Sequence, residues 1–386
     1  MKITDIKTLA VSYPLEEPLR WGNLYCHAVG SVIIQVSTDE GITGYGEAGP
    51  HPTFYERIRN IIETILKPLL LNRDPFDIEQ LWETMYGATH GHGRRGVDTY
   101  ALSGVDIALW DLVGKACGKP VYKILGGHSG RIQAYAAPSL KEPHVIAREC
   151  EEFVEQGFKA IKLRVGVGVE KDIEIVEAAR AAVGDEIQLM VDPNMAYSFR
   201  TAVEMGKVFE DYDVFWMEEP ILTHGLQQYV GELKRLSDHV NIRVAGGESL
   251  MTRFEFRDLL AQQAVDIVQP DCALGGGITD CRKVAHIATL WSVPCVPHVS
   301  CSTVPAFALA ANLHLIGSIP NHLFLEYPAY STPLREEFLV EPILAKGGYV
   351  DIPDKPGLGL EINEEALAKY AHQTSQVMTW ELGSGE

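Results

Sequence analysis

The second part of the chain repeats one pattern eight times, and this repeat restricts the fold more than any other feature. From about residue 131, short β-rich segments alternate with amphipathic helical stretches. The segments are AYAAPS, FKAIKL, IQLMVD, VFWMEE, IRVAGGE, VDIVQPD, VPCVPH and HLFLE. Helically spaced apolar residues fill the intervals, with Ser198 and Thr252 as expected N-caps and Gly184 at an expected helix end. Eight such units predict an α/β fold with a closed parallel barrel rather than an open sheet.

The first 125 residues follow a different pattern, that of an α+β domain. A strand is followed by a hairpin whose turn is Asp39-Glu40-Gly41. Helical patterns then cover 57–71 and 77–87, and a long, strongly apolar one covers 101–127. We therefore expect an α+β domain at 1–125, a barrel at 126–360, and a helical segment at 361–386 that leaves the barrel and packs elsewhere.

Composition and charge restrict the cellular compartment in which we expect the protein and the classes of molecule that it can bind. Of the 386 residues, 46% are hydrophobic and 22% are charged, which is typical of a soluble globular protein. No apolar run approaches the roughly 20 residues that a membrane helix needs, and the first residues lack a signal-peptide pattern. Seven scattered cysteines indicate a reducing compartment, so we expect a cytoplasmic protein, and we expect a homo-oligomer. The net charge of −19 opposes nucleic-acid binding, and an anionic substrate would need a metal or fixed positive charge at its site.

Ionisable residues fall at the ends of seven consecutive segments. They are Lys162, Asp192, Glu218, Glu248, Asp271, His298 and Glu326. Their separations are 30, 26, 30, 23, 27 and 28 residues, about one β/α unit each, and all C-terminal strand ends of such a barrel meet at one mouth. A lone carboxylate there commonly caps a helix or meets solvent. Seven ionisable groups around one mouth would cost several kcal/mol per uncompensated ion, so the set predicts a metal or substrate site.

Three of these residues are candidate metal ligands. Asp192, Glu218 and Glu248 come from adjacent strands, and oxygen ligands with positions left for water and substrate suit Mg²⁺ or Mn²⁺. Glu219 competes with Glu218 for the ligand role. A zinc site of Cys295, His298 and Cys301 is the weaker alternative, because a strand places Cys295 and His298 on opposite faces.

Two further pairs suggest acid–base chemistry. Lys162 and Arg164 are two apart and share the inner face of a strand. Arg164 stays protonated and is a poor base. Lys162 can serve as an acid–base group, because the pKa of a lysine shifts readily, or it is only a lysine whose side chain reaches the barrel rim. Asp271 and His298 end consecutive strands, so the carboxylate can orient the imidazole as a general base and acid, although His298 alone would read as a core histidine.

These residues together resemble the enolase superfamily, and specifically its mandelate racemase subgroup. The resemblance rests on Lys162-Leu163-Arg164, Asp192-Pro193-Asn194, Glu218-Glu219-Pro220, Gly246-Gly247-Glu248, Gln269-Pro270-Asp271 with Pro297-His298, and Glu326. It covers essentially the whole chain and also supports Glu218 over Glu219 as ligand. It implies a (β/α)7β modified TIM barrel whose mouth is closed by an α+β capping domain, formed by the N-terminal region and the C-terminal tail.

The resemblance also implies a reaction. In this family Mg²⁺ binds a carboxylate substrate, a base removes the α-proton, and the ene-diolate is stabilised by the metal. Arg164 stands where mandelate racemase has a second lysine, so a one-base reaction is favoured: dehydration of an acid sugar, an aldonate or aldarate, to a 2-keto-3-deoxy acid with His298 as base and acid. Lys162 and Arg164 would hold the substrate carboxylate, and Glu326 would hydrogen-bond the enediolate oxygen.

Other functions remain open at this point. A cycloisomerase of a sugar-acid lactone or anhydro sugar acid would use the same residues, and a racemase or epimerase is the third candidate. A catalytically inactive barrel used for binding, or a metal-dependent aldolase or hydrolase, fits the retained constellation less well. Substrate-binding residues are expected in the capping domain and beside the metal: Trp21, Asn23, His51, Arg95 and Asn194.

Overall fold

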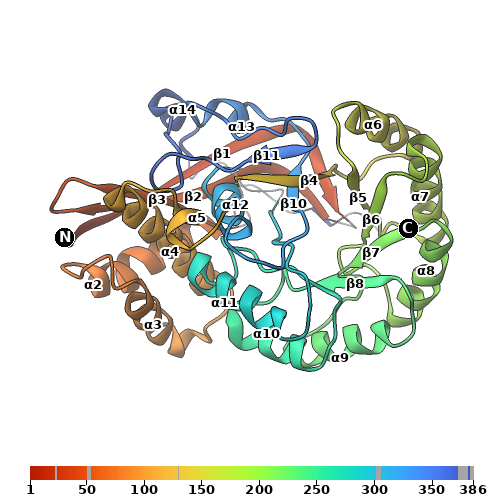
Figure 1. Ribbon diagram of the computed structural model, residues 1–386, viewed down its shortest axis with the longest axis horizontal. Helices are drawn as coiled ribbons and strands as arrows, with labels where there is room; N and C mark the ends of the chain where they lie inside the picture. The colour runs from red at the N-terminus through yellow and green to blue at the C-terminus, as the bar shows by residue number, and fades with distance from the viewer. Residues whose placement is uncertain (22–23, 50–53, 129, 301–305, 373–380, 383–386) are drawn as a thin grey trace.

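Two sheets organise the chain, one antiparallel and one parallel (Figure 1). The structure is a computed structural model that describes residues 1–21, 24–49, 54–128, 130–300, 306–372 and 381–382. Among these residues, no helix combines the length and the apolar character needed to span a membrane.

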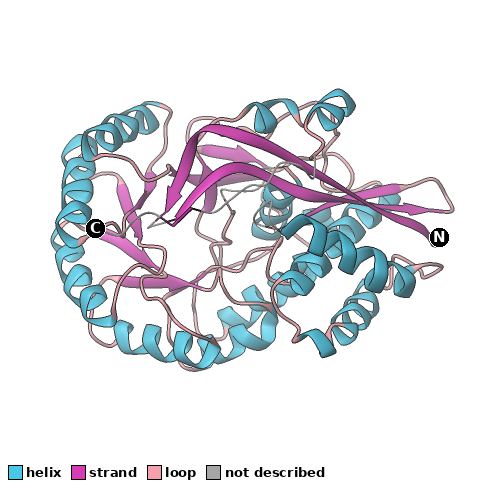
Figure 2. Cartoon of the chain, turned by 180° about the vertical axis from the view of Figure 1, so that it is seen from behind, coloured by secondary structure: helices cyan, strands magenta, loops and turns pink. Residues whose placement is uncertain are grey.

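The antiparallel sheet is built mainly by the N-terminal residues. Its strands are β1 (Ile3–Trp21), β2 (Leu24–Thr38), β3 (Thr43–Ala48) and the short C-terminal β12 (Glu381–Leu382), with β2 pairing with all three others. Gly41, with φ of 77°, lies in the turn between β2 and β3, as the sequence predicts. Figure 2 shows β1 and β2 as a long ribbon that extends toward the barrel strands.

A group of helices packs against this sheet. They are α1 (Tyr55–Ile61), the π-helical η2 (Ile62–Leu66), α2 (Lys67–Leu70), α3 (Ile78–Ala88), the 3₁₀ turn η3 (His90–His92), α4 (Val97–Cys117) and α5 (Val121–Ile124). Apolar side chains of β2, α3 and α4, among them Ile34, Trp82 and Leu109, form a core of their own. Gly46 of β3 permits the close approach of α4, because a Cβ there would lie 2.1 Å from the carbonyl oxygen of Gly104.

The parallel sheet forms the barrel. Its ladder runs β10 (Leu325–Pro328), β4 (Arg131–Ala137), β5 (Ala160–Arg164), β6 (Gln188–Asp192), β7 (Val214–Glu218), β8 (Arg243–Gly246) and β9 (Ile267–Val268). β11 (Tyr349–Asp351) adds antiparallel to β4. Single bridges from Val268 to Cys295 and from Cys295 to His322 continue the ring. The segment 293–298 thus forms only single bridges and is not a regular strand. The cause is that Pro294 and Pro297 have no backbone N–H to donate.

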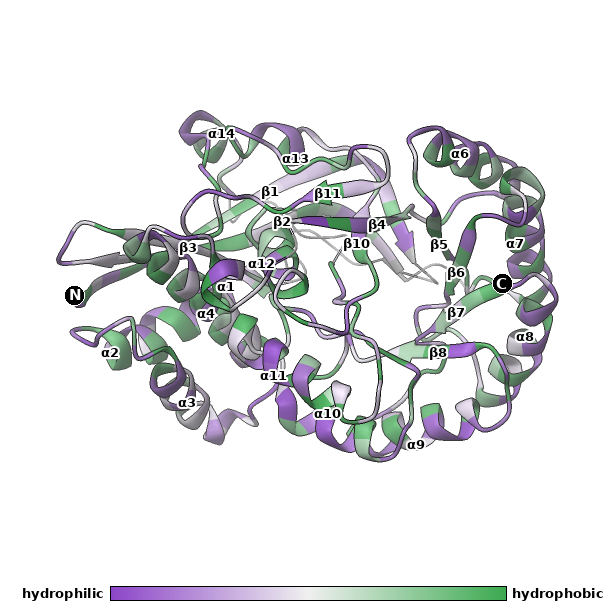
Figure 3. Ribbon diagram, in the orientation of Figure 1, coloured by the Kyte–Doolittle hydropathy of each residue, from purple (hydrophilic) through white to green (hydrophobic). Residues whose placement is uncertain are grey.

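Helices cover the outside of the barrel (Figures 1 and 2). They are α6 (Pro143–Glu155), α7 (Val169–Val183), α8 (Phe199–Asp211), α9 (Leu226–Ser237), α10 (Thr252–Ala261), α11 (Gly277–Thr289) and α12 (Phe307–Ile316), followed by α13 (Pro333–Glu337) and α14 (Glu364–Lys369). Figure 3 shows hydrophilic and hydrophobic residues mixed along most of these helices, as expected where one face meets the barrel and the other meets water. α12 differs, because all its residues are buried.

The predicted helix ends are partly right. Ser198 caps α8 by accepting the Thr201 N–H, and Gly184, with φ of 68°, ends α7. Thr252 does not cap α10: it is the first helical residue, and Met251 precedes it. Glu255 instead reaches back and accepts the N–H of Met251 at 2.7 Å, so a carboxylate from within the first turn satisfies this helix end.

The tail returns to the N-terminal sheet. Ala371 forms an antiparallel bridge with Val11, and the His372 N–H donates to the carbonyl of Ala10 at 2.8 Å. β12 then extends the sheet. The boundaries at residues 125 and 360 stay predictions.

Candidate active site

Along each of several barrel strands, the inward-facing side chains change from apolar to ionisable within two residues. Its lower layer contains Ala160, Met190 and Trp216, one from each of three adjacent strands. Side chains repeat on one face every second residue, so Lys162, Asp192 and Glu218 follow directly above them. The same step leads from Val296 to His298 and from Phe324 to Glu326. This alternation brings the predicted residues to one mouth.

The three predicted metal ligands lie together. Asp192, Glu218 and Glu248 each offer one carboxylate oxygen, and these oxygens lie within 4.8 Å of one another. Asp192 and Glu218 end β6 and β7, and Glu248 follows β8 by two residues. The backbone N–H of Asn194 donates to Asp192 Oδ1 at 2.8 Å, so this predicted substrate-binding residue borders the triad.

Second partners orient these carboxylates. Glu218 Oε2 accepts from Trp216 Nε1 at 3.1 Å and from Gln269 Nε2 at 2.7 Å, which leaves Oε1 turned toward Lys162. Glu219, the competitor for the ligand role, is bonded elsewhere. It accepts from the Tyr229 hydroxyl, from Ser249 Oγ at 2.7 Å and from the Gly247 N–H at 3.1 Å. Glu219 therefore shapes the loop that carries Glu248.

Lys162 lies at the centre of the carboxylates. Its Nζ contacts Glu218 Oε1, Glu326 Oε1 at 2.7 Å and Asp192 Oδ2 at 3.4 Å, and its side chain is fully buried. Burial lowers the pKa of Lys162, but the charges of Glu218 and Glu326 outweigh this and raise it well above its usual value. The side chain is thus a cation at neutral pH. Arg164 beside it forms an ion pair with Asp192 Oδ2.

Glu326 completes this group as an acceptor. Burial alone would raise its pKa, but Lys162 and His298 hold the pKa of Glu326 below its usual value. Its second oxygen accepts the N–H of Val299 at 3.0 Å. Both oxygens are therefore engaged, and a hydrogen bond donated by Glu326 would require a proton.

Asp271 and His298 form a close pair. His298 Nδ1 lies 2.8 Å from Asp271 Oδ2, and Nε2 lies 3.2 Å from Glu248 Oε2. Burial lowers the pKa of His298, but Glu248 and the bond to Asp271 raise it well above its usual value. The imidazole therefore lies between its orienting carboxylate and the acidic triad. Cys295 belongs to the apolar core outside the barrel, so it does not share a site with His298.

The donor set fits a hard divalent cation. All three converging ligands are carboxylates, the type that Mg²⁺ and Mn²⁺ prefer over the nitrogen and sulfur of zinc sites. Burial, only partly offset by Lys162, raises the pKa of Glu218 to about 7, and burial, partly offset by His298, raises that of Glu248 to about 8. Beside them, Gln269 Oε1 is buried without a hydrogen-bond partner among the described residues. When ionised, the three carboxylates can hold a metal ion whose positive charge compensates theirs.

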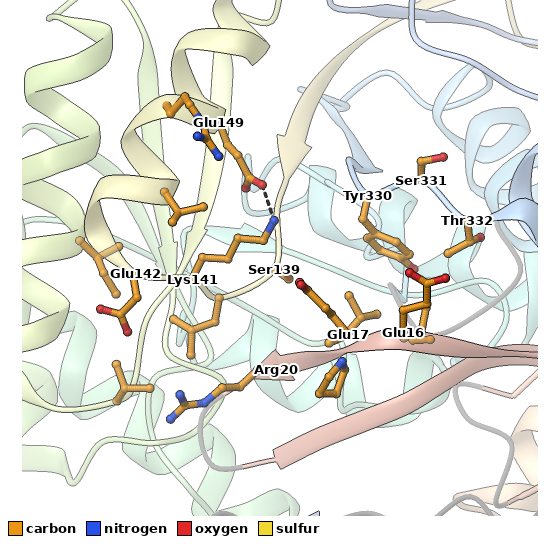
Figure 4. Close-up of a pocket in the computed structure, with 18 of the residues that line it drawn as sticks. Glu16, Glu17, Arg20, Ser139, Lys141, Glu142, Glu149, Tyr330, Ser331 and Thr332 are labelled. Carbon is orange, nitrogen blue, oxygen red and sulfur yellow. Dashed lines mark hydrogen bonds and ion pairs between the residues drawn. The ribbon is translucent and has the colours of Figure 1, made fainter.

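A cavity of about 1100 Å³ opens beside the Arg164 side of the site. Figure 4 shows its labelled lining: Glu16, Glu17 and Arg20 of β1, Ser139, Lys141 and Glu142 after β4, Glu149 of α6, and Tyr330, Ser331 and Thr332 after β10. A smaller pocket shares Leu19, Arg20, Ser139 and Tyr330 with it and reaches Arg164. Four basic and four acidic side chains line the cavity, so it is locally balanced in a strongly acidic protein.

The remaining predicted substrate-binding residues are less defined. Trp21 is the last residue of β1, whereas Asn23 and His51 lie outside the described residues. Arg95 donates to the carbonyl of Ser249 at 3.0 Å and pairs with Glu255 at 3.0 Å, so it supports the loop next to Glu248.

Sequence reasoning missed several supporting residues. Gln269 was visible as the residue two before Asp271 on the same strand face. Asn312 is a single amide inside the apolar run FALAANLHLI, an anomaly that could have marked it. Glu219 was considered as a possible ligand, but no signal in the sequence pointed to its supporting role, since its partners come from α9 and from the loop after β8.

Both parts of the chain match known protein families. Residues 3–126 match the family "Mandelate racemase / muconate lactonizing enzyme, N-terminal domain", and residues 145–366 match "Enolase C-terminal domain-like". The chain is 35% identical over 377 residues to arabinonate dehydratase of Saccharolobus solfataricus, covering 95% of this chain and 99% of that protein. It is 34% identical over 385 residues to D-galactarolactone cycloisomerase of Agrobacterium fabrum, covering 96% and 99%.

A solved structure of another enzyme has a closely similar fold. The 3,6-anhydro-D-galactonate cycloisomerase from Zobellia galactanivorans superposes with a TM-score of 0.87 at 31% identity, covering 97% of this chain and 100% of that one. With both halves of the chain matched and the barrel and cap in place, the chain belongs to the mandelate racemase/muconate lactonizing enzyme family of the enolase superfamily.

Proposed function

We propose that this protein dehydrates an acid sugar, an aldonate or aldarate, to a 2-keto-3-deoxy acid. One observation carries the proposal: His298 is held by Asp271 at 2.8 Å with its other nitrogen at the acidic triad, while the opposite group, Lys162, is a buried cation. The site thus offers one proton-transfer group and one fixed positive charge. The dehydratase named among its relatives supports the same reaction class.

The residues divide the work as follows. Mg²⁺ held by Asp192, Glu218 and Glu248, with Mn²⁺ as substitute, would supply charge stabilisation at the substrate carboxylate. His298 Nε2 removes the α-proton, and the electrons of that C–H bond move onto the substrate carboxylate, which becomes an ene-diolate. Their return forms the carbon–carbon double bond between Cα and Cβ as the β C–O bond breaks. His298 returns the proton to the departing hydroxyl, which leaves as water, and the enol product becomes the ketone.

Lys162 and Arg164 hold the substrate carboxylate. A base role for Lys162 is disfavoured, because its Nζ is enclosed by three carboxylates, those of Glu218, Glu326 and Asp192, as their shared counter-ion. Racemisation needs an acid–base group on each face of one carbon, and neither cation on this side gives up a proton readily. In this scheme Glu326 orients Lys162, and it hydrogen-bonds the enediolate oxygen only after gaining a proton.

The far end of the sugar would occupy the cavity beside Arg164. Polar side chains of both signs suit a ligand with many hydroxyl groups, and Ser139 and Tyr330 line both this cavity and the pocket that reaches Arg164. Trp21, Asn23, His51 and Arg95 remain proposed contributors from the capping domain.

The test is product formation from a library of acid sugars with Mg²⁺. We expect His298→Asn to abolish ketoacid formation while it leaves Mg²⁺ binding intact, and His286→Asn, on the outer helix α11, to change neither. Full activity in the His298→Asn variant would refute the assignment of the base.

A cycloisomerase is the second candidate, favoured by the 34% identity to D-galactarolactone cycloisomerase. Here the same elimination would expel a ring oxygen instead of water. NMR spectroscopy of the product distinguishes the two, because a dehydratase product has lost water whereas a cycloisomerase product is an isomer of its substrate.

A further inference from the structure

One buried amide joins the two barrel segments that carry the Asp271–His298 pair. Asn312 of α12 donates from Nδ2 to the carbonyl of His298 at 3.1 Å. Its Oδ1 accepts the N–H of Cys272, the residue after Asp271, at 3.2 Å. Only this orientation of the amide satisfies both partners, since one is an acceptor and the other a donor.

This bridge lies where the backbone ladder between the two segments fails. The N–H groups of Val296 and His298 donate to the carbonyls of Val268 and Pro270, at 3.0 and 3.1 Å. The return bond from residue 270 is missing because proline has no N–H. The next donor in this register is Cys272, and its N–H goes to Asn312 rather than directly to His298. The amide thus continues the ladder through a side chain at the level of the acid–base pair.

The helix that carries Asn312 is fixed to the capping domain. The N–H of Ala308 in its first turn donates to Glu47 Oε2 of β3 at 2.9 Å, and Glu47 also accepts from Ser31 of β2. The ring of Phe307 stacks on Tyr45 with centroids 5.8 Å apart. Because α12 is buried along its whole length, its packing fixes the position from which Asn312 holds the two barrel segments.

We propose that Asn312 is a positioning residue that sets the contact between His298 and Asp271. Its side-chain hydrogen bonds among the described residues go to the backbone of His298 and Cys272, not to the proposed metal ligands or the side chains of the pair, so it acts through the backbone. The kinetic part of its test rests on the proposed function. The spectroscopic part needs no substrate.

Two variants test this role. Asn312→Ala removes both bonds, and Asn312→Asp keeps the volume and the acceptor for Cys272 but loses the donor to His298. We expect kcat to fall about 10- to 100-fold in each, as for a misplacement of about 1 Å, with KM changed less than about threefold. The affinity for Mg²⁺ should stay that of the wild type. The low-field proton resonance of the His298–Asp271 hydrogen bond should shift or disappear.

Asn321→Ala is the matched control. That amide also makes two barrel hydrogen bonds, to the carbonyls of Ala285 and Val293 at 3.1 and 2.9 Å, and among the described residues its side chain bonds to neither member of the pair. A loss of kcat equal to that in Asn321→Ala, or an unchanged low-field resonance in a folded Asn312 variant, would overturn the proposal. If the wild-type protein turns over no acid sugar, the resonance alone decides it, so failure of the proposed reaction is recognised separately.

Discussion

Acid should weaken Mg²⁺ binding far more than three exposed carboxylates would allow. Burial raises the pKa of Glu218 to about 7 and that of Glu248 to about 8, and both are ligands of the proposed site. Asp192 behaves differently, because Arg164 and Lys162 outweigh burial and hold its pKa below its usual value. A cation that binds all three as carboxylates must therefore displace protons from the two glutamates.

The pKa values set the size of the effect. At pH 6 the protonated form outnumbers the ionised one by about 10 to 1 at Glu218 and by about 100 to 1 at Glu248. Affinity for Mg²⁺ should therefore rise about 10³-fold between pH 6 and pH 9, and binding at pH 6 should release about two protons. Exposed glutamates, with an ordinary pKa near 4.3, would release almost none at that pH.

Calorimetry in two buffers of different ionisation enthalpy measures both quantities. The difference in apparent enthalpy gives the number of protons released, and the titration gives the affinity. Glu248→Gln should release about one proton fewer at pH 6 than the wild type. An affinity that is constant from pH 6 to pH 8, or the absence of proton release at pH 6, would refute the picture of a buried triad of partly protonated ligands.

Two further changes probe buried charges. Burial lowers the pKa of His314 from 6.5 to about 4, so the folded state binds a proton at this residue less readily than the unfolded state does. The stability that His314 contributes is therefore present above pH 6.5 and falls by about 2 kcal/mol toward pH 5. Urea unfolding of the wild type and of His314→Asn should resolve this difference. Lys162→Met leaves Glu218 and Glu326 facing each other without their cation, so the metal-free protein should lose about 3–5 kcal/mol of stability in thermal melts, and Mg²⁺ should restore part of it. A variant as stable as the wild type would show that Lys162 does not compensate these charges.

Much of the site could be predicted because it follows a short-range rule. Residues such as Lys162, Asp192 and Glu218 follow buried β-rich segments, and parallel strands deliver their C-terminal ends to one mouth whatever the details of packing. The spacing of about one β/α unit then places neighbours in order around the ring. The resemblance to the family suggested the chemical role of each residue, and it was needed to choose Glu218 over Glu219 as the metal ligand.

The parts that escaped prediction depend on contacts between distant segments. Thr252 looked like an N-cap, but Glu255 and the packing of α10 satisfy that helix end instead. Glu219 is recognised as a loop support only when Tyr229 and Ser249 are placed around it. Local propensity is a weak guide at such positions, since tertiary partners decide which polar group bonds to which.

The capping domain also supports the barrel segments that carry the proposed catalytic pair, Asp271 and His298. Asp106 of α4 accepts from the Thr279 N–H at 3.0 Å in the first turn of α11, the helix that follows Asp271. Glu47 of β3 does the same for Ala308 in α12, the helix that follows His298. Burial raises the pKa of both carboxyls to about 7, so burying their charge is costly, and that cost is offset only while barrel N–H groups face them. The two helices behind the acid–base pair thus begin against the cap, so a shift of the cap would also displace the helices that follow Asp271 and His298.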